Sequence, residues 1–295
     1  MTQNSVQNPA PAPDPAPDPV LVIGGTGKTG RRVVRRLTES GVPVRSASRS
    51  GETRFDWLDE TTWGPALDGV SGVYIVQNDT EPRTRELARR AAAAGVRRLV
   101  LLSARGVDTP GYYGEDPSTS DAFLAGEAAV RESGLAWTVL RPGWFAQNFD
   151  EGFFNEGVLS GELRLPAGDG AATWIDVEDI AAVAVAALTE DGHDGQTYEL
   201  SGPRAVSLPE VLDLIGAATG RKATYTPLST PDFIAELGAQ GVPAADAAIW
   251  AAALYPVQQG FEAKVSDGVR RALGREPRDF ADYVAAAAES GAWRA

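Results

Sequence analysis

Short apolar segments alternate with longer amphipathic ones through the first half of the chain. The short segments are rich in Val, Ile and Leu and lack the polar alternation of a half-exposed strand. Continuously apolar strands of this kind are typical of a parallel sheet that is covered on both faces. The pattern therefore predicts an α/β protein with a doubly wound parallel sheet. The expected strands are residues 20–24, 42–48, 72–77, 98–103 and 136–142, and the helices between them are 28–39, 82–94 and 119–133.

Three regions of different character follow one another along the chain. Residues 1–19 carry proline at every second position from Pro9 to Pro19, which predicts an extended, disordered tail. Residues 20–150 hold the regular alternation and are expected to form one domain. Beyond residue 150 the regular alternation of strands and helices changes, so we expect residues 151–295 to complete the sheet in part and to form a smaller C-terminal α/β lobe.

Capping residues mark the helices of the second half. A helix is expected from about Val177, with Asp176 near its cap, and another has Ser207 as its N-cap and Gly220 beyond its end. Asp176 and Asp179 resemble a catalytic carboxylate pair, but we expect them to serve the helix start.

Composition excludes several classes of function. The chain has 295 residues and a net charge of −13, which disfavours nucleic acid and acidic membrane surfaces as partners. There is no cysteine, so disulfides, thiolate chemistry and zinc-finger sites are excluded. The single histidine, His193, lies in a Gly/Asp-rich segment and is expected to be a solvated loop residue, so no metal site is expected. No signal peptide or membrane-spanning run is evident, which favours a cytoplasmic protein, either a monomer or a homodimer.

The segment "VLVIGGTGKTG" at residues 20–30 admits two interpretations. Its Gly27-Lys28-Thr29 matches the end of a nucleoside-triphosphate P-loop, but that motif needs a glycine where Val22 stands inside the first strand. The spacing Gly24-x-x-Gly27-x-x-Gly30, after a strand and opening a helix, instead matches the dinucleotide-binding turn of a Rossmann fold. The residues predicted to hold the pyrophosphate are Gly24, Gly25, Thr26, Gly27, Lys28, Thr29 and Gly30.

The end of the second strand indicates which dinucleotide is bound. NAD enzymes usually carry a carboxylate there for the ribose hydroxyls, whereas this strand ends in Ser48 and Arg49. A guanidinium suits a 2′-phosphate, and Lys28 adds positive charge nearby. These residues predict a preference for NADP(H), with an ordinary surface role for Arg49 as the alternative.

Longer segments of the chain resemble the NmrA-like branch of the atypical short-chain dehydrogenases/reductases, which includes ergot-alkaloid iminium reductases and NADPH-quinone oxidoreductases. The resemblance covers roughly residues 20–290 and implies a Rossmann domain, a C-terminal substrate lobe and NADPH as cofactor. It places Asp56 and Trp57 beside the adenine, Gln77 and Asn78 near the adenosine ribose, and Ser103 at the nicotinamide. The segments that carry it are "VIGGTGKTGRRVVRRL", "VRSASRS", "FDWLDETTWGPALDGVSGVYIV", "GVRRLVLLSA", "GEAAVRESGLAWTVLRPGWFAQNF" and "WIDVEDIAAVAVAAL".

The chain departs from the wider superfamily at its catalytic Tyr-x-x-x-Lys pair. Alignment puts Thr119 at the tyrosine position and Phe123 at the lysine position, and no lysine lies between Lys28 and Lys222. Ordinary ketone reduction is therefore not expected. Hydride transfer to an already electrophilic acceptor, such as an iminium ion, a quinone or a conjugated enone, needs less acid assistance. Tyr112 and Tyr113 are the polar candidates for a proton-donating or positioning role.

Aromatic residues are concentrated in the segment "GWFAQNFDEGFF". At helical spacing, Phe145, Phe149 and Phe153 share a stripe, which is typical either of core packing or of a flat apolar pocket for an aromatic substrate. The residues expected to line a substrate pocket are Phe123, Trp144, Phe145, Phe149 and Trp174.

Two other functions stay open: a redox sensor that binds NADP(H) without turnover, and an isomerase or cyclase in which NADP(H) is structural.

Overall fold

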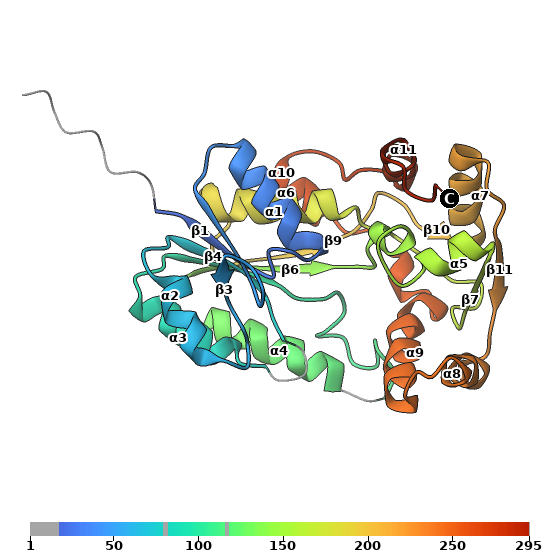
Figure 1. Ribbon diagram of the computed structural model, residues 1–295, viewed down its shortest axis with the longest axis horizontal. Coiled ribbons are helices and arrows are strands. Elements are labelled where there is room, and N and C mark those ends of the chain that lie inside the picture. The colour runs from blue at the N-terminus through green and yellow to red at the C-terminus, as the bar shows by residue number, and fades with distance from the viewer. Residues whose placement is uncertain (1–17, 79–81, 116–117, 295) are drawn as a thin grey trace, which may run out of the picture.

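A seven-stranded parallel sheet forms the larger half of the protein (Figure 1). The computed structural model describes residues 18–78, 82–115 and 118–294, so the predicted disorder of the tail falls almost entirely outside the described residues. The strand order, from one edge to the other, is β3 (Thr53–Arg54), β2 (Val44–Ser48), β1 (Val20–Ile23), β4 (Gly72–Val76), β5 (Arg98–Leu102), β6 (Ala136–Pro142) and β9 (Gln196–Leu200). The strand order reverses at β1: β2 and β3 extend the sheet on one side of it, and β4 and the later strands extend it on the other. Ligands of such sheets bind at the carboxyl ends of the strands beside that reversal.

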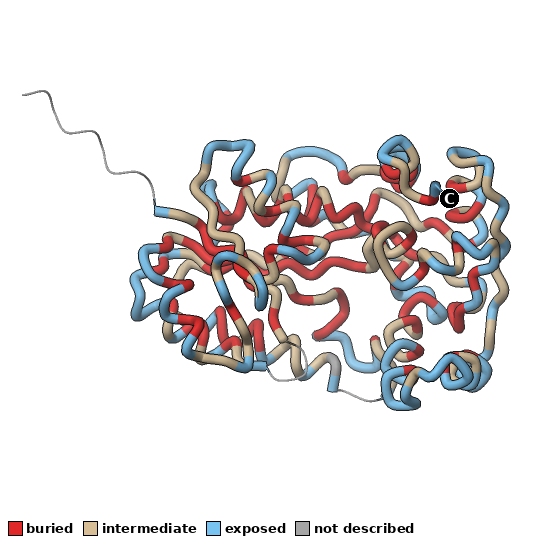
Figure 2. Tube along the Cα trace, viewed as in Figure 1, coloured by how far each residue is buried: buried red, intermediate tan, exposed pale blue. Residues whose placement is uncertain are grey.

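Alternate side chains of β1 enter two different cores. Val20 and Val22 pack on one face of the sheet, and Leu21 and Ile23 pack on the other, so every position of this strand is apolar. The first face is covered by α1 (Lys28–Glu39), α6 (Val177–Thr189) and α10 (Gly268–Leu273). The second face is covered by η1 (Glu60–Thr62), α2 (Trp63–Leu67), α3 (Thr84–Ala93) and α4 (Ser118–Arg131). Figure 2 shows the resulting buried layer along the strands. The predicted fold class is confirmed.

Residues after 150 serve both halves of the molecule. They supply β9, α6 and α10 to the sheet half, and the remainder builds a lobe with a core of its own (Figure 1). Two small sheets brace the lobe: β8 with β10, antiparallel, and β7 with β11, parallel. The lobe elements are η2 (Ala146–Phe149), α5 (Asn155–Ser160), β7 (Glu162–Leu165), β8 (Ala171–Ala172), β10 (Val206–Ser207), α7 (Leu208–Thr219), β11 (Thr224–Pro227), α8 (Thr230–Ala239), α9 (Ala244–Gln258), η3 (Phe261–Ala263) and α11 (Phe280–Ser290).

Two predictions about polar side chains have different outcomes. Asp176 is the N-cap of α6 and accepts a hydrogen bond from the backbone N–H of Glu178, as predicted. Asp179 instead accepts hydrogen bonds from the Arg275 side chain and the backbone N–H of Arg278, so it connects the C-terminal segment to α6.

In the described part of the chain, no helix is both long and apolar enough to span a membrane.

His193 is not the solvated residue that its loop sequence predicts. Its exposed fraction is 7%, and its Nδ1 lies 3.0 Å from the Tyr198 hydroxyl of β9. The Thr138 hydroxyl donates to its carbonyl oxygen. The glycine-rich loop folds back on the sheet edge, so the imidazole is a packed structural group.

Candidate active site

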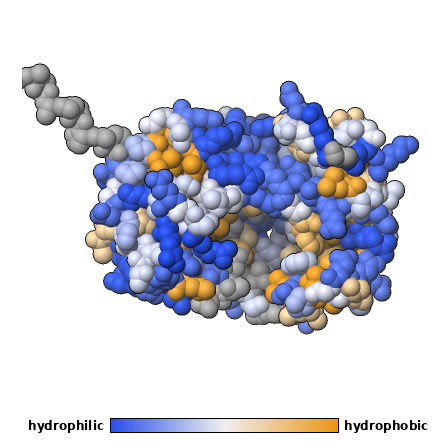
Figure 3. Space-filling model, viewed as in Figure 1, coloured by the Kyte–Doolittle hydropathy of each residue, from blue (hydrophilic) through white to orange (hydrophobic). Residues whose placement is uncertain are grey.

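Two adjoining cavities lie at the carboxyl ends of the central strands, between the sheet half and the lobe. The larger has a volume of 730 Å³ and the smaller 390 Å³. Figure 3 shows the surface hollowed between the two halves of the molecule. The side chains that line both cavities come from α1, the ends of β4 and β5, and the segment after β6: Lys28, Val76, Gln77, Leu102 and Phe145.

The glycine-rich turn forms one wall of the larger cavity. Gly24 has a φ of +76°, a conformation that favours glycine. A Cβ on Gly30 would lie 2.1 Å from the carbonyl oxygen of Gly24, and a Cβ on Gly25 would lie 2.3 Å from the Ser46 Oγ. Gly25 and Gly30 thus allow close packing, while Gly24, Thr26, Gly27, Lys28 and Thr29 line the cavity. With Gly27 as the N-cap of α1, the free amides of the helix start lie beside a cavity suited to a pyrophosphate.

The far end of this cavity carries the residues predicted for the adenosine and its phosphate. Ser48, Arg49, Asp56 and Trp57 all line it, together with Gln77 and Asn78. Arg49 is exposed and has no ion-pair partner among the described residues, and the buried Ser48 Oγ has no hydrogen-bond partner. The Trp57 indole is fixed by a 3.1 Å hydrogen bond to the carbonyl of Val76. An unpaired guanidinium beside an unsatisfied hydroxyl fits a 2′-phosphate.

The smaller cavity has an aromatic lining. Phe123 of α4 lines it with Trp144 and Phe145. Ser103, from the end of β5, also lines it, and its hydroxyl donates to Glu127 at 2.7 Å. Glu127 is fully buried and accepts from Arg141, which fixes α4 against β5 and β6.

Phe149 and Trp174 do not line either cavity, in contrast to the prediction. Their ring centroids lie 5.0 Å apart within the core of the lobe, where both side chains are fully buried. The expected stripe is broken because η2 is a 3-10 turn with three residues per turn, so residues four apart do not share a face, and the chain bends before α5. As a result Phe145 faces the cavities while Phe149 packs into the core. Core packing, one of the two interpretations of the aromatic spacing, therefore holds for Phe149.

The two candidate tyrosines are held by protein acceptors. The Tyr112 hydroxyl donates to Glu262 at 2.8 Å, and the Tyr113 hydroxyl donates to the backbone carbonyl of Arg105 at 2.6 Å. Burial and the Glu262 carboxylate raise the pKa of both phenols, the opposite of the activation that a dyad lysine supplies. Tyr113 lines the smaller cavity and Tyr112 does not.

Glu262 and Arg105 are site residues that sequence reasoning missed. Glu262 comes from η3 of the lobe and lines the smaller cavity, and the nearly buried Arg105 lies 3.4 Å from its carboxylate. The two residues are 157 positions apart, and "QQGFEAK" matches no motif. Nothing in the local sequence indicates that this carboxylate is buried.

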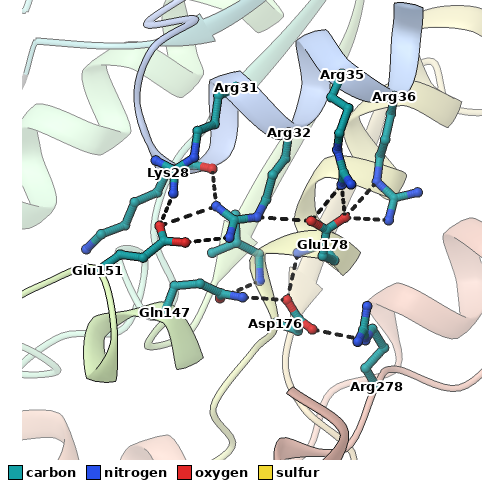
Figure 4. Close-up of polar contacts among 11 residues, drawn as sticks. Lys28, Arg31, Arg32, Arg35, Arg36, Gln147, Glu151, Asp176, Glu178 and Arg278 are labelled. Carbon is teal, nitrogen blue, oxygen red and sulfur yellow. Dashed lines mark hydrogen bonds and ion pairs between the residues drawn. The ribbon is translucent and has the colours of Figure 1, made fainter. Parts of the chain in front are cut away.

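The arginines of α1 pair with carboxylates from the second half of the chain (Figure 4), and Lys28 at the start of the helix also contacts that half. The Lys28 Nζ donates to Asn148 at 2.7 Å, and burial lowers its pKa. Arg32 pairs with Glu151 at 2.7 Å and with Glu178 at 3.1 Å, and the latter carboxylate also pairs with two further arginines of the helix. All four arginines of α1 form ion pairs, although the two carboxylates balance only half of their charge, and Lys28 lines both cavities.

Comparisons with known proteins agree with this geometry. Residues 24–191, more than half of the chain, match the family described as NAD(P)H-binding. The chain is 35% identical to the NAD(P)H azoreductase of Xenophilus azovorans, with 90% of this chain and 97% of that protein covered. It is 36% identical to the (4-alkanoyl-5-oxo-2,5-dihydrofuran-3-yl)methyl phosphate reductase of Streptomyces griseus, with 92% and 98% covered.

A solved structure extends the agreement to three dimensions. The NADPH-dependent quinone oxidoreductase QOR2 from Escherichia coli, crystallised with NADPH, superposes with a TM-score of 0.77 at 25% identity, covering 90% of this chain and 99% of that one. The chain therefore belongs to the NAD(P)H-binding family and is an NAD(P)H-dependent oxidoreductase.

Proposed function

We propose that this protein uses NADPH to reduce small, flat organic acceptors that are already electrophilic, namely conjugated carbonyl compounds, quinones or iminium ions. The observation that carries the proposal is the aromatic cavity of 390 Å³, which adjoins the dinucleotide cavity and is lined by Phe123, the residue that the sequence alignment places at the lysine position of a ketone reductase. A cavity of this size suits a ligand of one or two rings.

Different residues would contact the phosphates and the nicotinamide end of the cofactor. The amides at the start of α1 hold the pyrophosphate, and Ser48 and Arg49 hold the 2′-phosphate. Ser103, fixed by Glu127, borders the nicotinamide end. When bound, NADPH supplies the hydride, and the chain orients the acceptor against it.

The aromatic lining favours conjugated acceptors over saturated ones. Phe123, Trp144 and Phe145 offer flat apolar surfaces on which a planar ring stacks well. The names of the relatives support this class, since an azo compound, a quinone and an alkanoyl-oxo-dihydrofuran are all conjugated electrophiles. None of them needs a phenol activated by lysine.

The test is NADPH oxidation with a panel of acceptors: a naphthoquinone, a cyclic enone, an iminium salt and, for comparison, a saturated ketone. We expect turnover with one or more conjugated acceptors and none with the saturated ketone. Trp144→Ala should raise KM for the acceptor and leave NADPH binding unchanged, because Trp144 lines only the smaller cavity. Tight NADPH binding without turnover on any acceptor would support the redox-sensor alternative.

A further inference from the structure

A buried carboxyl group stands in the wall of the proposed acceptor cavity. Glu262 is only 3% exposed, although it comes from a short turn of the lobe. Its Oε1 accepts from the Tyr112 hydroxyl at 2.8 Å, and its Oε2 lies 3.4 Å from Nη1 of Arg105. A carboxyl group so far removed from water is costly to bury, so its position calls for an explanation.

The chain leaves space for this carboxyl group at the cavity. A Cβ on Gly143, which also lines the cavity, would lie 2.7 Å from Oε2 of Glu262 and 3.5 Å from Nη1 of Arg105. The oxygen therefore packs against the backbone of a cavity residue. An ion pair that only joined the lobe to the sheet would not need a place in the cavity lining.

The groups around Glu262 set its proton affinity. Arg105 and Tyr112 face it from the segment after β5, Tyr113 lies beside them, and Glu199 of β9 is the other carboxylate nearby. Burial raises the pKa of Glu262, while the charge of Arg105 and the Tyr112 hydrogen bond lower it, and burial has the larger effect. Burial thus favours the neutral acid, and Arg105 stabilises the carboxylate once the proton leaves.

We propose that Glu262 is the general acid of this site and protonates the acceptor oxygen as the hydride arrives. This inference rests on the proposed function. For an enone, the hydride adds to the β-carbon, the π electrons move to the carbonyl oxygen, and the O–H bond of Glu262 breaks as the enol O–H bond forms. The carboxylate left behind pairs with Arg105 and regains a proton from water, and the enol tautomerises in solution.

The experiment compares two acceptors that differ in their need for a proton. An enone takes a hydride and a proton, whereas an N-alkylated iminium salt takes a hydride alone and gives a neutral amine. Glu262→Gln should lower kcat for the enone by about 100-fold and leave kcat for the iminium salt within a few-fold of wild type. The matched control is Glu132→Gln, which removes an exposed carboxylate that pairs with Arg85 and does not line the cavity, and it should affect neither reaction.

Two further measurements keep the inference testable if Glu262→Gln folds poorly. In the wild type, the enone rate should fall as pH rises through the pKa of Glu262, and the iminium rate should not. Gly143→Ala, which also narrows the cavity, should lower both rates, and it should lower the enone rate further because the methyl group displaces the carboxyl group.

Each result has a distinct meaning. Equal loss for both acceptors in Glu262→Gln, or an enone rate that does not depend on pH, would overturn the general-acid role and leave Glu262 as a structural ion pair. If the wild type reduces neither acceptor, the proposed function itself fails for both.

Discussion

Arg49 provides a quantitative test of cofactor choice. The side chain is exposed, lines the dinucleotide cavity and has no partner in the described parts of the chain, so Arg49→Gln breaks no internal contact. A hydrogen bond to a charged group contributes about 1.5–3 kcal/mol, and screening by water places an exposed one at the lower limit. Since about 1.4 kcal/mol corresponds to tenfold in affinity, we expect Kd for NADPH to rise about tenfold.

The assay is fluorescence titration of wild type and Arg49→Gln with NADPH and with NADH. The Kd for NADH should stay constant, and the salt dependence of NADPH binding should weaken in the variant. Arg54→Gln is the matched control, because Arg54 is a nearby strand arginine that pairs with Asp59 and does not line the cavity. An equal change for both cofactors, or no change for NADPH, would refute the assignment of Arg49 to the 2′-phosphate.

Three other substitutions test the packing and charges that hold the site. Gly30→Ala places a methyl group 2.1 Å from the Gly24 carbonyl oxygen and should abolish NADPH binding, at a stability cost of about 1–3 kcal/mol seen in thermal unfolding. Glu127→Gln leaves two arginines without their fully buried partner and should cost about 3 kcal/mol in urea unfolding. At Glu178, burial raises the pKa, but the bond from Arg36 and the nearby arginine charges lower it below 4.5. The stability of wild type over Glu178→Gln should therefore be present above pH 4.5 and be lost as pH falls through the lowered pKa.

Matched control variants distinguish the specific effects of these three substitutions from non-specific destabilisation. Gly64→Ala adds a methyl group that meets nothing within 4 Å, and its Tm should not fall. Glu132→Gln removes an exposed partner of Arg85 and should cost less than about 1 kcal/mol. Glu39→Gln, on the exposed end of α1, should change stability by no more than about 0.5 kcal/mol. A Glu127→Gln variant as stable as Glu132→Gln, or a Glu178→Gln advantage that persists in acid, would contradict the corresponding argument.

Prediction from sequence succeeded where the deciding forces act over a few residues. The strands were located to within about two residues, because continuous apolar runs of that length have few alternatives to a doubly covered sheet. The turn from Gly24 to Gly30 was identified for the same reason, since its steric demands involve neighbours along the chain. His193 was misjudged because a glycine-rich loop indicates exposure only on average, and this one folds back onto Tyr198.

The amino-acid sequence by itself determined the fold class, the glycine turn and the residues at the carboxyl ends of the strands. Tertiary structure alone decided which aromatic side chains face the cavities, because the 3-10 turn η2 points Phe145 and Phe149 in different directions. It also decided that Glu262 meets Arg105, a contact across 157 positions that no local pattern encodes. Periodicity and capping report short-range constraints, whereas the acceptor site forms only when the lobe packs against the strand ends and buries a charge that the chain would otherwise leave in water.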